Sequence, residues 1–150
     1  MKRRLWISGV LALLLSACGS SVGVGDNGVD NLASTRVKAS SQELLSSAVM
    51  GVFQGEGFAV LSRTSQSITF TKQGGRSADV MWKTLGNSNP VMIRPTVSWR
   101  PSGAGEYWLG CQVEVAQEST VFGETVRQPM MVGKSAYNDL LRQVKRRVER

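Results

Sequence analysis

Two cysteines and the lack of any histidine limit the chemistry open to this 150-residue chain. Cys111 alternates in phase with Leu109 and Val113, so we expect its thiol to face a core, where cysteine behaves as a small hydrophobic residue. A reactive thiol would need exposure and a lowered pKa. Without histidine the chain has neither the commonest general base nor the commonest metal ligand, and triads that use histidine are excluded.

The tripeptide Gly133-Lys134-Ser135 is similar to the end of a phosphate-binding loop and stands at the start of a predicted helix. That motif requires another glycine five residues before Gly133, where this sequence has Gln128 followed by Pro129. A loop without this glycine cannot surround the phosphates. Ser135 is therefore better explained as the cap of the helix.

The acidic residues offer no catalytic pair. They lie scattered at polar positions, and their spacing brings no two of them together, so paired-carboxylate chemistry has no support: Glu106, Glu114, Glu118 and Glu124. We therefore predict no catalytic residue, no metal site and no cofactor other than a covalent lipid discussed below. We expect that the protein is not an enzyme.

Basic residues are the first candidates for an interaction surface. The last predicted helix ends with a cluster opposed only by Glu149: Arg142, Lys145, Arg146, Arg147 and Arg150. This cluster is either a patch that docks on anionic lipid headgroups, lipopolysaccharide phosphate or an acidic partner, or a solvated face whose cations meet the negative end of the helix dipole.

Trp108 is the second candidate. With Met92 and Arg94 it falls on the outer face of a predicted hairpin, where an exposed tryptophan could mark a partner-binding patch. The alternative is that a helix covers this face. The candidate interaction surface is thus Trp108, Arg142, Lys145 and Arg146.

The N-terminus has the layout of a secretory signal. Three basic residues at positions 2–4 precede an apolar run from Leu5 to Leu15. This run is shorter than the ~20 apolar residues of a membrane-spanning helix.

The residues that follow the run, Leu15-Ser16-Ala17-Cys18, resemble the lipobox of bacterial lipoproteins. The resemblance implies that a signal peptide of residues 1–17 is cut off and that Cys18 becomes the first residue. Its thiol would then carry diacylglycerol and its amino group an acyl chain. Gly19 stands where an aspartate commonly retains such proteins in the inner membrane, which implies the outer membrane.

Removal of the signal changes the charge. The full chain has 18 basic and 11 acidic residues, and without positions 2–4 the balance is 15 against 11, about +4 instead of +7. Nucleic-acid binding loses its main support. If Cys18 carries lipid, Cys111 has no partner for a disulfide within the chain.

Composition and apolar spacing divide the rest of the chain. Residues 18–39 are rich in Gly, Ser, Asp and Asn and show no periodicity, which predicts a lipidated flexible tether before a folded domain of residues 40–150. Ser40 or Ser41 is expected to cap a first helix. The further elements predicted are strands 58–62 and 67–72, a strand within 120–128 and a helix over 135–148. Residues 77–85 favour a short helix, although the same apolar spacing also fits a strand.

Residues 91–100 and 107–115 alternate strongly and predict a second hairpin around a loop at 101–105. Matching the apolar faces predicts cross-strand pairs Trp99–Tyr107, Val97–Leu109 and Ile93–Val113, and places Arg100 opposite Glu106. Pro95 lacks a backbone donor and predicts an edge strand or a bulge.

These elements predict an α+β fold: a two-layer sandwich in which N- and C-terminal helices pack on an antiparallel sheet of about four to five strands, two hairpins plus one strand. The expected function is that of a lipid-anchored lipoprotein of the cell envelope, in the outer membrane with its domain in the periplasm. It would be a non-enzymatic accessory or scaffold with an envelope protein partner. The alternative is a binding module for an amphiphile or an envelope glycan.

Overall fold

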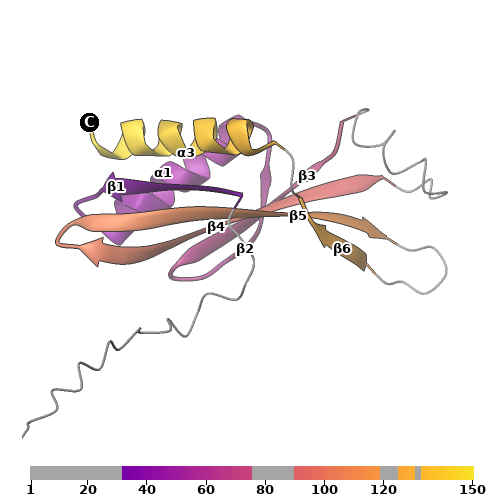
Figure 1. Cartoon of the computed structure of the whole chain (residues 1–150), viewed down its shortest axis with the longest axis horizontal. Helices are drawn as coiled ribbons and strands as arrows, with labels where there is room; N and C mark the ends of the chain where they lie inside the picture. Colours follow the sequence, from indigo (N-terminus) through magenta and orange to yellow (C-terminus); the bar gives the residue numbers. More distant parts are fainter. Residues whose placement is uncertain (1–31, 76–89, 119–124, 131–132) are drawn as a thin grey trace, which may run out of the picture.

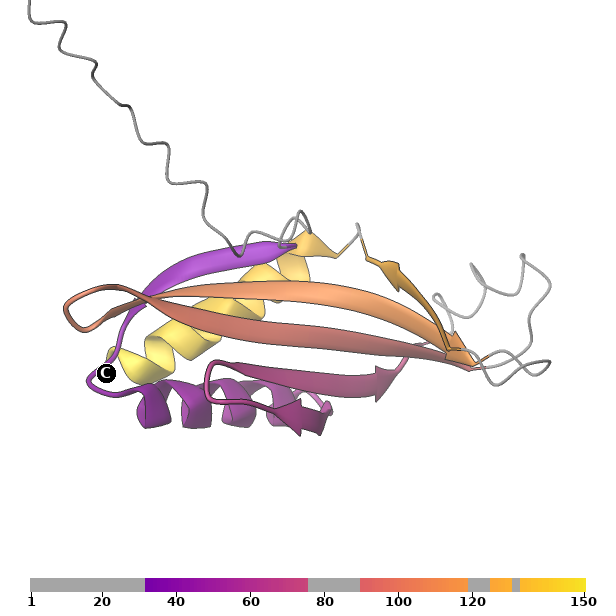
Figure 2. The ribbon, with the colours of Figure 1, turned by 90° about the horizontal axis from the view of Figure 1, so that it is seen from below.

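The computed structural model describes residues 32–75, 90–118, 125–130 and 133–150. It has the predicted α+β architecture, an antiparallel sheet with both helices packed on one face (Figures 1 and 2). The elements in chain order are β1 (Ala33–Lys38), α1 (Gln42–Gly55), β2 (Ala59–Arg63), β3 (Ser67–Gln73), β4 (Val91–Gly103), β5 (Glu106–Glu118), β6 (Thr125–Pro129) and α3 (Lys134–Val148).

Most of these elements confirm the sequence prediction. The β2–β3 hairpin and both long helices lie within a few residues of the expected bounds, and β6 falls in the segment predicted as the last strand. The helix expected over 77–85 lies outside the described residues. No described helix has the length and apolar character needed to cross a membrane.

The sheet has the strand order β1-β5-β4-β3-β2, and β6 also pairs with β5. β1 pairs with the first half of β5, where Val37 lies opposite Tyr107. β6 pairs with the second half, where Gln128 lies opposite Val115. The two strands therefore share one edge of β5, and the sheet in the described residues has one strand more than the four to five predicted.

The additional strand β1 corrects the predicted tether. Residues 33–39 were expected in the tether, but Ala33 and Val37 are 2% and 1% exposed and belong to the core. The Ala39 N–H also donates to the Gly105 carbonyl at 2.9 Å. The prediction of a tether is thus wrong from residue 33 onward, because pairing with β5 orders a segment whose own apolar pattern is weak. Residues 18–31 lie outside the described part.

Helix α1 begins as its sequence predicts. Ser41 is the N-cap, and its Oγ accepts a hydrogen bond from the Leu44 N–H at 3.2 Å. Its apolar face turns into the core with Leu45, Ala48, Val49, Val52 and Phe53. Beyond the helix, Gly57 adopts a left-handed backbone with φ +83°, which a residue with a side chain rarely adopts.

The long β4–β5 hairpin has the predicted faces but a different register. Trp99 lies opposite Leu109 rather than Tyr107, a shift of two residues that also moves the other pairs. Val97 now faces Cys111 and Ile93 faces Val115. Since the shift is even, each side chain stays on its predicted face.

The turn of this hairpin explains the shift. Residues 101–105 were expected to form the loop, but β4 continues to Gly103 with a bulge between Pro101 and Gly103. The connection is then only Ala104 and Gly105, and Gly105 has a φ of +68°. As a result Arg100 lies opposite Trp108, and the predicted pairing of Arg100 with Glu106 is wrong.

Pro95 also lies in an unexpected place, because β4 is central and runs between β3 and β5. The β3–β4 ladder pairs Thr69 with Thr96 and resumes where Lys72 faces Ile93. The gap between these pairs falls at Pro95, which has no N–H to donate. The sheet thus accepts a proline in a central strand by interrupting one ladder.

The core fills the space between the sheet and the two helices. Phe53 of α1 stacks on Phe70 of β3 with 4.7 Å between ring centroids. From α3, Leu141 and Val144 are fully buried. The inward side chains of β4 and β5 complete the core and are at most 3% exposed: Val97, Trp99, Leu109, Cys111 and Val113.

Candidate functional site

Helix α3 carries the basic cluster, and its start corrects one prediction. Gly133 is the N-cap, with φ +88° and no side-chain hydrogen bond at the cap, so Ser135 lies inside the first turn instead of capping the helix. The apolar residues of α3 all face the core: Tyr137, Leu140, Leu141, Val144 and Val148. This inward face fixes the direction in which the basic residues between them point.

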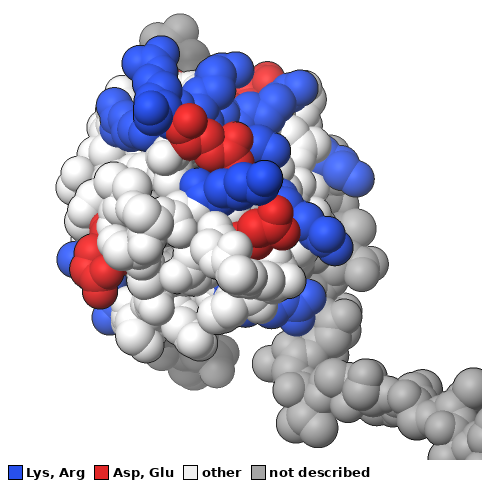
Figure 3. All heavy atoms as spheres, turned by 90° about the vertical axis from the view of Figure 1, so that its left-hand side faces the viewer, with Lys and Arg blue, Asp and Glu red and all other residues white. Residues whose placement is uncertain are grey.

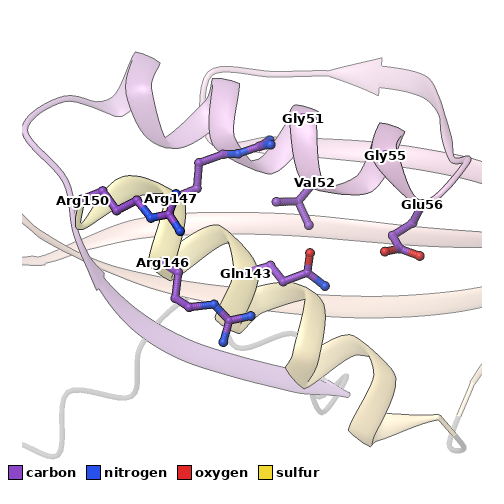
Figure 4. A pocket seen from close by; sticks show the side chains of 8 residues that line it. All are labelled: Gly51, Val52, Gly55, Glu56, Gln143, Arg146, Arg147 and Arg150. Atoms are coloured by element: carbon purple, nitrogen blue, oxygen red, sulfur yellow. The ribbon is translucent and has the colours of Figure 1, made fainter.

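A groove lies between α3 and α1 on the side away from the sheet. It has a volume of about 400 Å³, and Figure 4 shows the eight residues that line it, which together define the arginine groove: Gly51, Val52, Gly55, Glu56, Gln143, Arg146, Arg147 and Arg150. Gly51 and Gly55 are one helical turn apart, so this part of the α1 wall is bare backbone.

Arg147 crosses the groove. Its side chain extends from α3 to α1, and its guanidinium lies where a Cβ on residue 51 would be (Figure 4). Only glycine leaves this space without displacing the arginine. Arg150 lies beside Arg147 at one end of the groove, and Glu56 lies at the other end.

The basic residues of α3 differ in their partners. Arg142 pairs with Asp139 one turn earlier, and Lys145 Nζ lies 3.9 Å from Glu149 Oε1. That Glu149 oxygen also accepts a hydrogen bond from the Lys38 N–H at 2.9 Å. In contrast, three exposed arginines form no ion pair with any described residue: Arg146, Arg147 and Arg150. The groove therefore keeps uncompensated positive charge.

The C-terminus and the tip of the β4–β5 hairpin lie at the same end of the molecule (Figure 1). Figure 3 looks onto this end and shows Lys and Arg side chains gathered over its upper part, where α3 lies. β1 adds Arg36 and Lys38, both exposed, and Lys38 Nζ lies 3.9 Å from Glu106 Oε1. We call this end of the molecule, with the basic residues of the last turns of α3 and with Arg36 and Lys38 of β1, the basic end.

The candidate surface predicted from the sequence separates into two parts. Arg142, Lys145 and Arg146 lie together on α3, as predicted. Trp108 lies on the face of the sheet opposite to the helices, because its neighbour Leu109 points into the core. There the Arg100 guanidinium covers the Trp108 ring, 4.5 Å from its centroid. Trp108 is thus not part of the arginine groove.

Sequence reasoning placed Arg147 and Arg150 in the basic cluster but not among the site residues, and it gave Gly51 no role. The spacing of Gly51 and Gly55 could have indicated that one face of this helix lacks side chains and leaves room for a neighbouring group. The sequence does not show that Arg147, far away in the chain, passes over Gly51.

A second groove of about 350 Å³ continues past Glu56 and Gln143, which line both. Lys72 lies in it, with its Nζ 5.1 Å from the centroid of the Phe58 ring and donating to the Glu56 carbonyl at 2.5 Å. This lysine already has partners, so the second groove has less free charge than the first.

Cys111 lies in the core, as its alternation predicted. Burial raises the pKa of its thiol from 9.0 to about 12, so the thiol stays protonated at neutral pH and is a poor nucleophile. Burial, and secondarily the charge of Cys111, also raises the pKa of Tyr137. Within the described ranges, no group of three or more His, Cys, Asp or Glu residues is arranged to hold a metal ion.

No protein-family model matches the sequence, and no curated protein matches it.

Proposed function

We propose that this chain is a lipid-anchored protein of the bacterial cell envelope, held in the outer membrane through Cys18, with its α+β domain acting in the periplasm as a non-enzymatic accessory or scaffold of an envelope complex. The observation that carries the proposal is the lipobox-type segment Leu15-Ser16-Ala17-Cys18 after a short apolar run. Several acyl chains on one residue anchor a protein durably, whereas a single chain holds it weakly.

The dimensions of the chain are consistent with this arrangement. From Cys18 to Ala33, the start of β1, there are 15 residues. Fully extended they span at most ~50 Å, taking 3.3–3.6 Å per residue. An anchor at Cys18 would therefore keep the domain close to the bilayer at all times.

A non-enzymatic role is supported by where the chemistry-bearing groups lie. Cys111 is buried and protonated. The carboxylates of α1, Glu43, and of β5, Glu114, are exposed on separate elements. The arginine groove, in contrast, is suited to holding a negatively charged partner.

The alternative function, a binding module for an amphiphile or a glycan, would use the same groove. Its lining favours the charged part of such a ligand, because three arginines and a glutamine supply donors there. A long apolar tail would find little matching surface in it.

The test is crosslinking in a bacterial host, followed by membrane extraction and recovery of the tagged protein. The control is Cys18→Ala, which cannot accept the lipid. We expect the wild-type protein in the outer-membrane fraction with a defined set of envelope proteins, and loss of both in the control. Recovery of the same partners from unlipidated Cys18→Ala, or a soluble wild-type protein, would contradict the proposal.

A further inference from the structure

Three arginines without ion-pair partners in the described residues meet at one groove. Arg147 crosses to Gly51, Arg150 lies beside it, and Arg146 completes the lining from α3 (Figure 4). A guanidinium presents a planar fork of N–H donors that matches the oxygen atoms of a phosphate. The groove is therefore chemically suited to phosphate groups, with Glu56 at its far end as the one acidic residue of its lining.

The position of this groove relative to the proposed anchor is also defined. β1 runs from Ala33 to Lys38, about 20 Å for six residues at ~3.3 Å each. At its end the Lys38 N–H donates to Glu149, directly after α3. The chain thus enters the domain at Ala33, about the length of β1 from the basic end. The residues between Cys18 and Ala33 span at most ~50 Å when extended, which lets the basic end reach the membrane.

We infer that the arginine groove and the basic end around it dock on anionic phospholipid headgroups of the membrane that holds Cys18. This inference rests on the proposed function for the anchor. It specifies which surface of the domain faces the bilayer. The domain would then lie with its C-terminal end against the membrane instead of taking up any orientation that its connection to Cys18 allows.

Lipid fits this surface better than a protein does. Protein interfaces are built around buried apolar or aromatic anchors. The large hydrophobic residues exposed in the described part are Leu44, Val60 and Leu61, and none of them lines the groove. Each contact of the domain with the membrane also needs little affinity, because the anchor at Cys18 holds the domain at a high effective concentration beside the bilayer.

The test is vesicle binding by the chain of residues 18–150 carrying Cys18→Ser, so that the anchor makes no contribution. Vesicles of phosphatidylcholine with phosphatidylglycerol are compared with phosphatidylcholine alone, at about 0.15 M salt, where charges more than ~8 Å apart are largely screened. The variant Arg147→Gln/Arg150→Gln removes two groove charges. Its matched control, Arg63→Gln/Lys134→Gln, removes two exposed charges elsewhere.

We expect binding to the phosphatidylglycerol vesicles only. One basic residue near an anionic surface contributes about a five-fold change in binding, so the groove variant should bind about 25-fold more weakly. The control should stay within a factor of about two, because neither Arg63 nor Lys134 lines the arginine groove. Unchanged melting temperatures would show that both variants remain folded.

Three results would overturn the inference: equal binding to both kinds of vesicle, equal weakening by the groove variant and its control, or binding of soluble poly-glutamate but not of phosphatidylglycerol vesicles. The last result would assign the groove to an acidic protein segment. Lipidation of Cys18 is measured on the protein from cells, so failure of the anchor and failure of the docking surface give different results.

Discussion

The two faces of α3 have opposite physical roles. On the inner face, Leu141 and Val144 are fully buried against the sheet and α1. On the outer face, Arg146 and Arg147 are exposed, as is Arg150 just after the helix, and none of the three forms an ion pair with described residues. The same fifteen-residue helix thus holds the fold together on one side and presents positive charge on the other.

This difference separates stability from binding within one element. Burying an aliphatic side chain stabilises a fold by about 1.5–3 kcal/mol. A cation in the last turn of a helix contributes only about 0.3–1 kcal/mol, and salt reduces that. Selection for a docking surface can therefore act on the outer face of α3 at little cost to the fold.

The largest effect is expected on the inner face. Leu141→Ala removes a side chain that is 0% exposed, and it should lower the free energy of unfolding by about 2–5 kcal/mol through lost burial and a residual cavity. Urea unfolding followed by circular dichroism measures this. The control is Asn138→Ala on the same helix, which should change stability by less than about 0.5 kcal/mol. Comparable losses in both variants would contradict the assignment of faces.

An intermediate effect is expected from pH, through Cys111 beneath the helix layer. Its folded-state pKa of about 12 lies above its ordinary value of 9.0, so the folded protein holds the proton more tightly than the unfolded chain does. Stability from this group is complete below pH 9 and falls as the pH rises toward 12, by up to about 1.4 kcal/mol per unit.

Cys111→Val removes this titration and should flatten the loss of stability between pH 9 and pH 10.5, measured by urea unfolding at both pH values. Tyr137, whose pKa burial also raises, contributes in the same direction, and Tyr137→Phe isolates its part. If the free energy of unfolding of Cys111→Val has the same pH dependence as that of the wild type, the Cys111 thiol does not have this raised pKa.

The smallest effect is expected on the outer face. Arg147→Gln/Arg150→Gln should lower the free energy of unfolding by less than about 1 kcal/mol, because both side chains are exposed and lose only their interaction with the helix dipole and the surface contact of Arg147 with Gly51. Thermal unfolding at low and at moderate salt checks this. A loss as large as that of Leu141→Ala would show that these arginines hold the fold together, and the separation of the two faces would not stand.

Local patterns predicted much of this fold, because both helices, β3 and the β4–β5 hairpin bury a regular apolar face, whereas β2 is exposed along its whole length. The parts that sequence reasoning missed depend on contacts between distant residues. β1 was assigned to the tether because only its small or branched residues Ala33 and Val37 turn inward, and its partner is β5, far along the chain. The register of β4 and β5 was shifted by two because a bulge near Pro101 takes up part of the expected loop.

The candidate site was predictable to the same extent. The basic residues are evident in the sequence, and their helical spacing predicted that they would share a face. That Arg147 passes over Gly51 follows from the packing of α3 on α1 and has no local signature. Trp108 was a separate candidate on the outer face of the hairpin, with a covering helix as the alternative, and it lies on the sheet face opposite to the helices.

The most direct test of the account is the intact mass of the protein extracted from bacterial membranes, since the proposed function depends on the lipid at Cys18. The account predicts a chain that begins at Cys18 and carries the added mass of a diacylglyceryl group and an acyl chain. The Cys18→Ala variant should carry neither. A wild-type mass that corresponds to an unmodified Cys18, or to cleavage at another residue, would contradict the account.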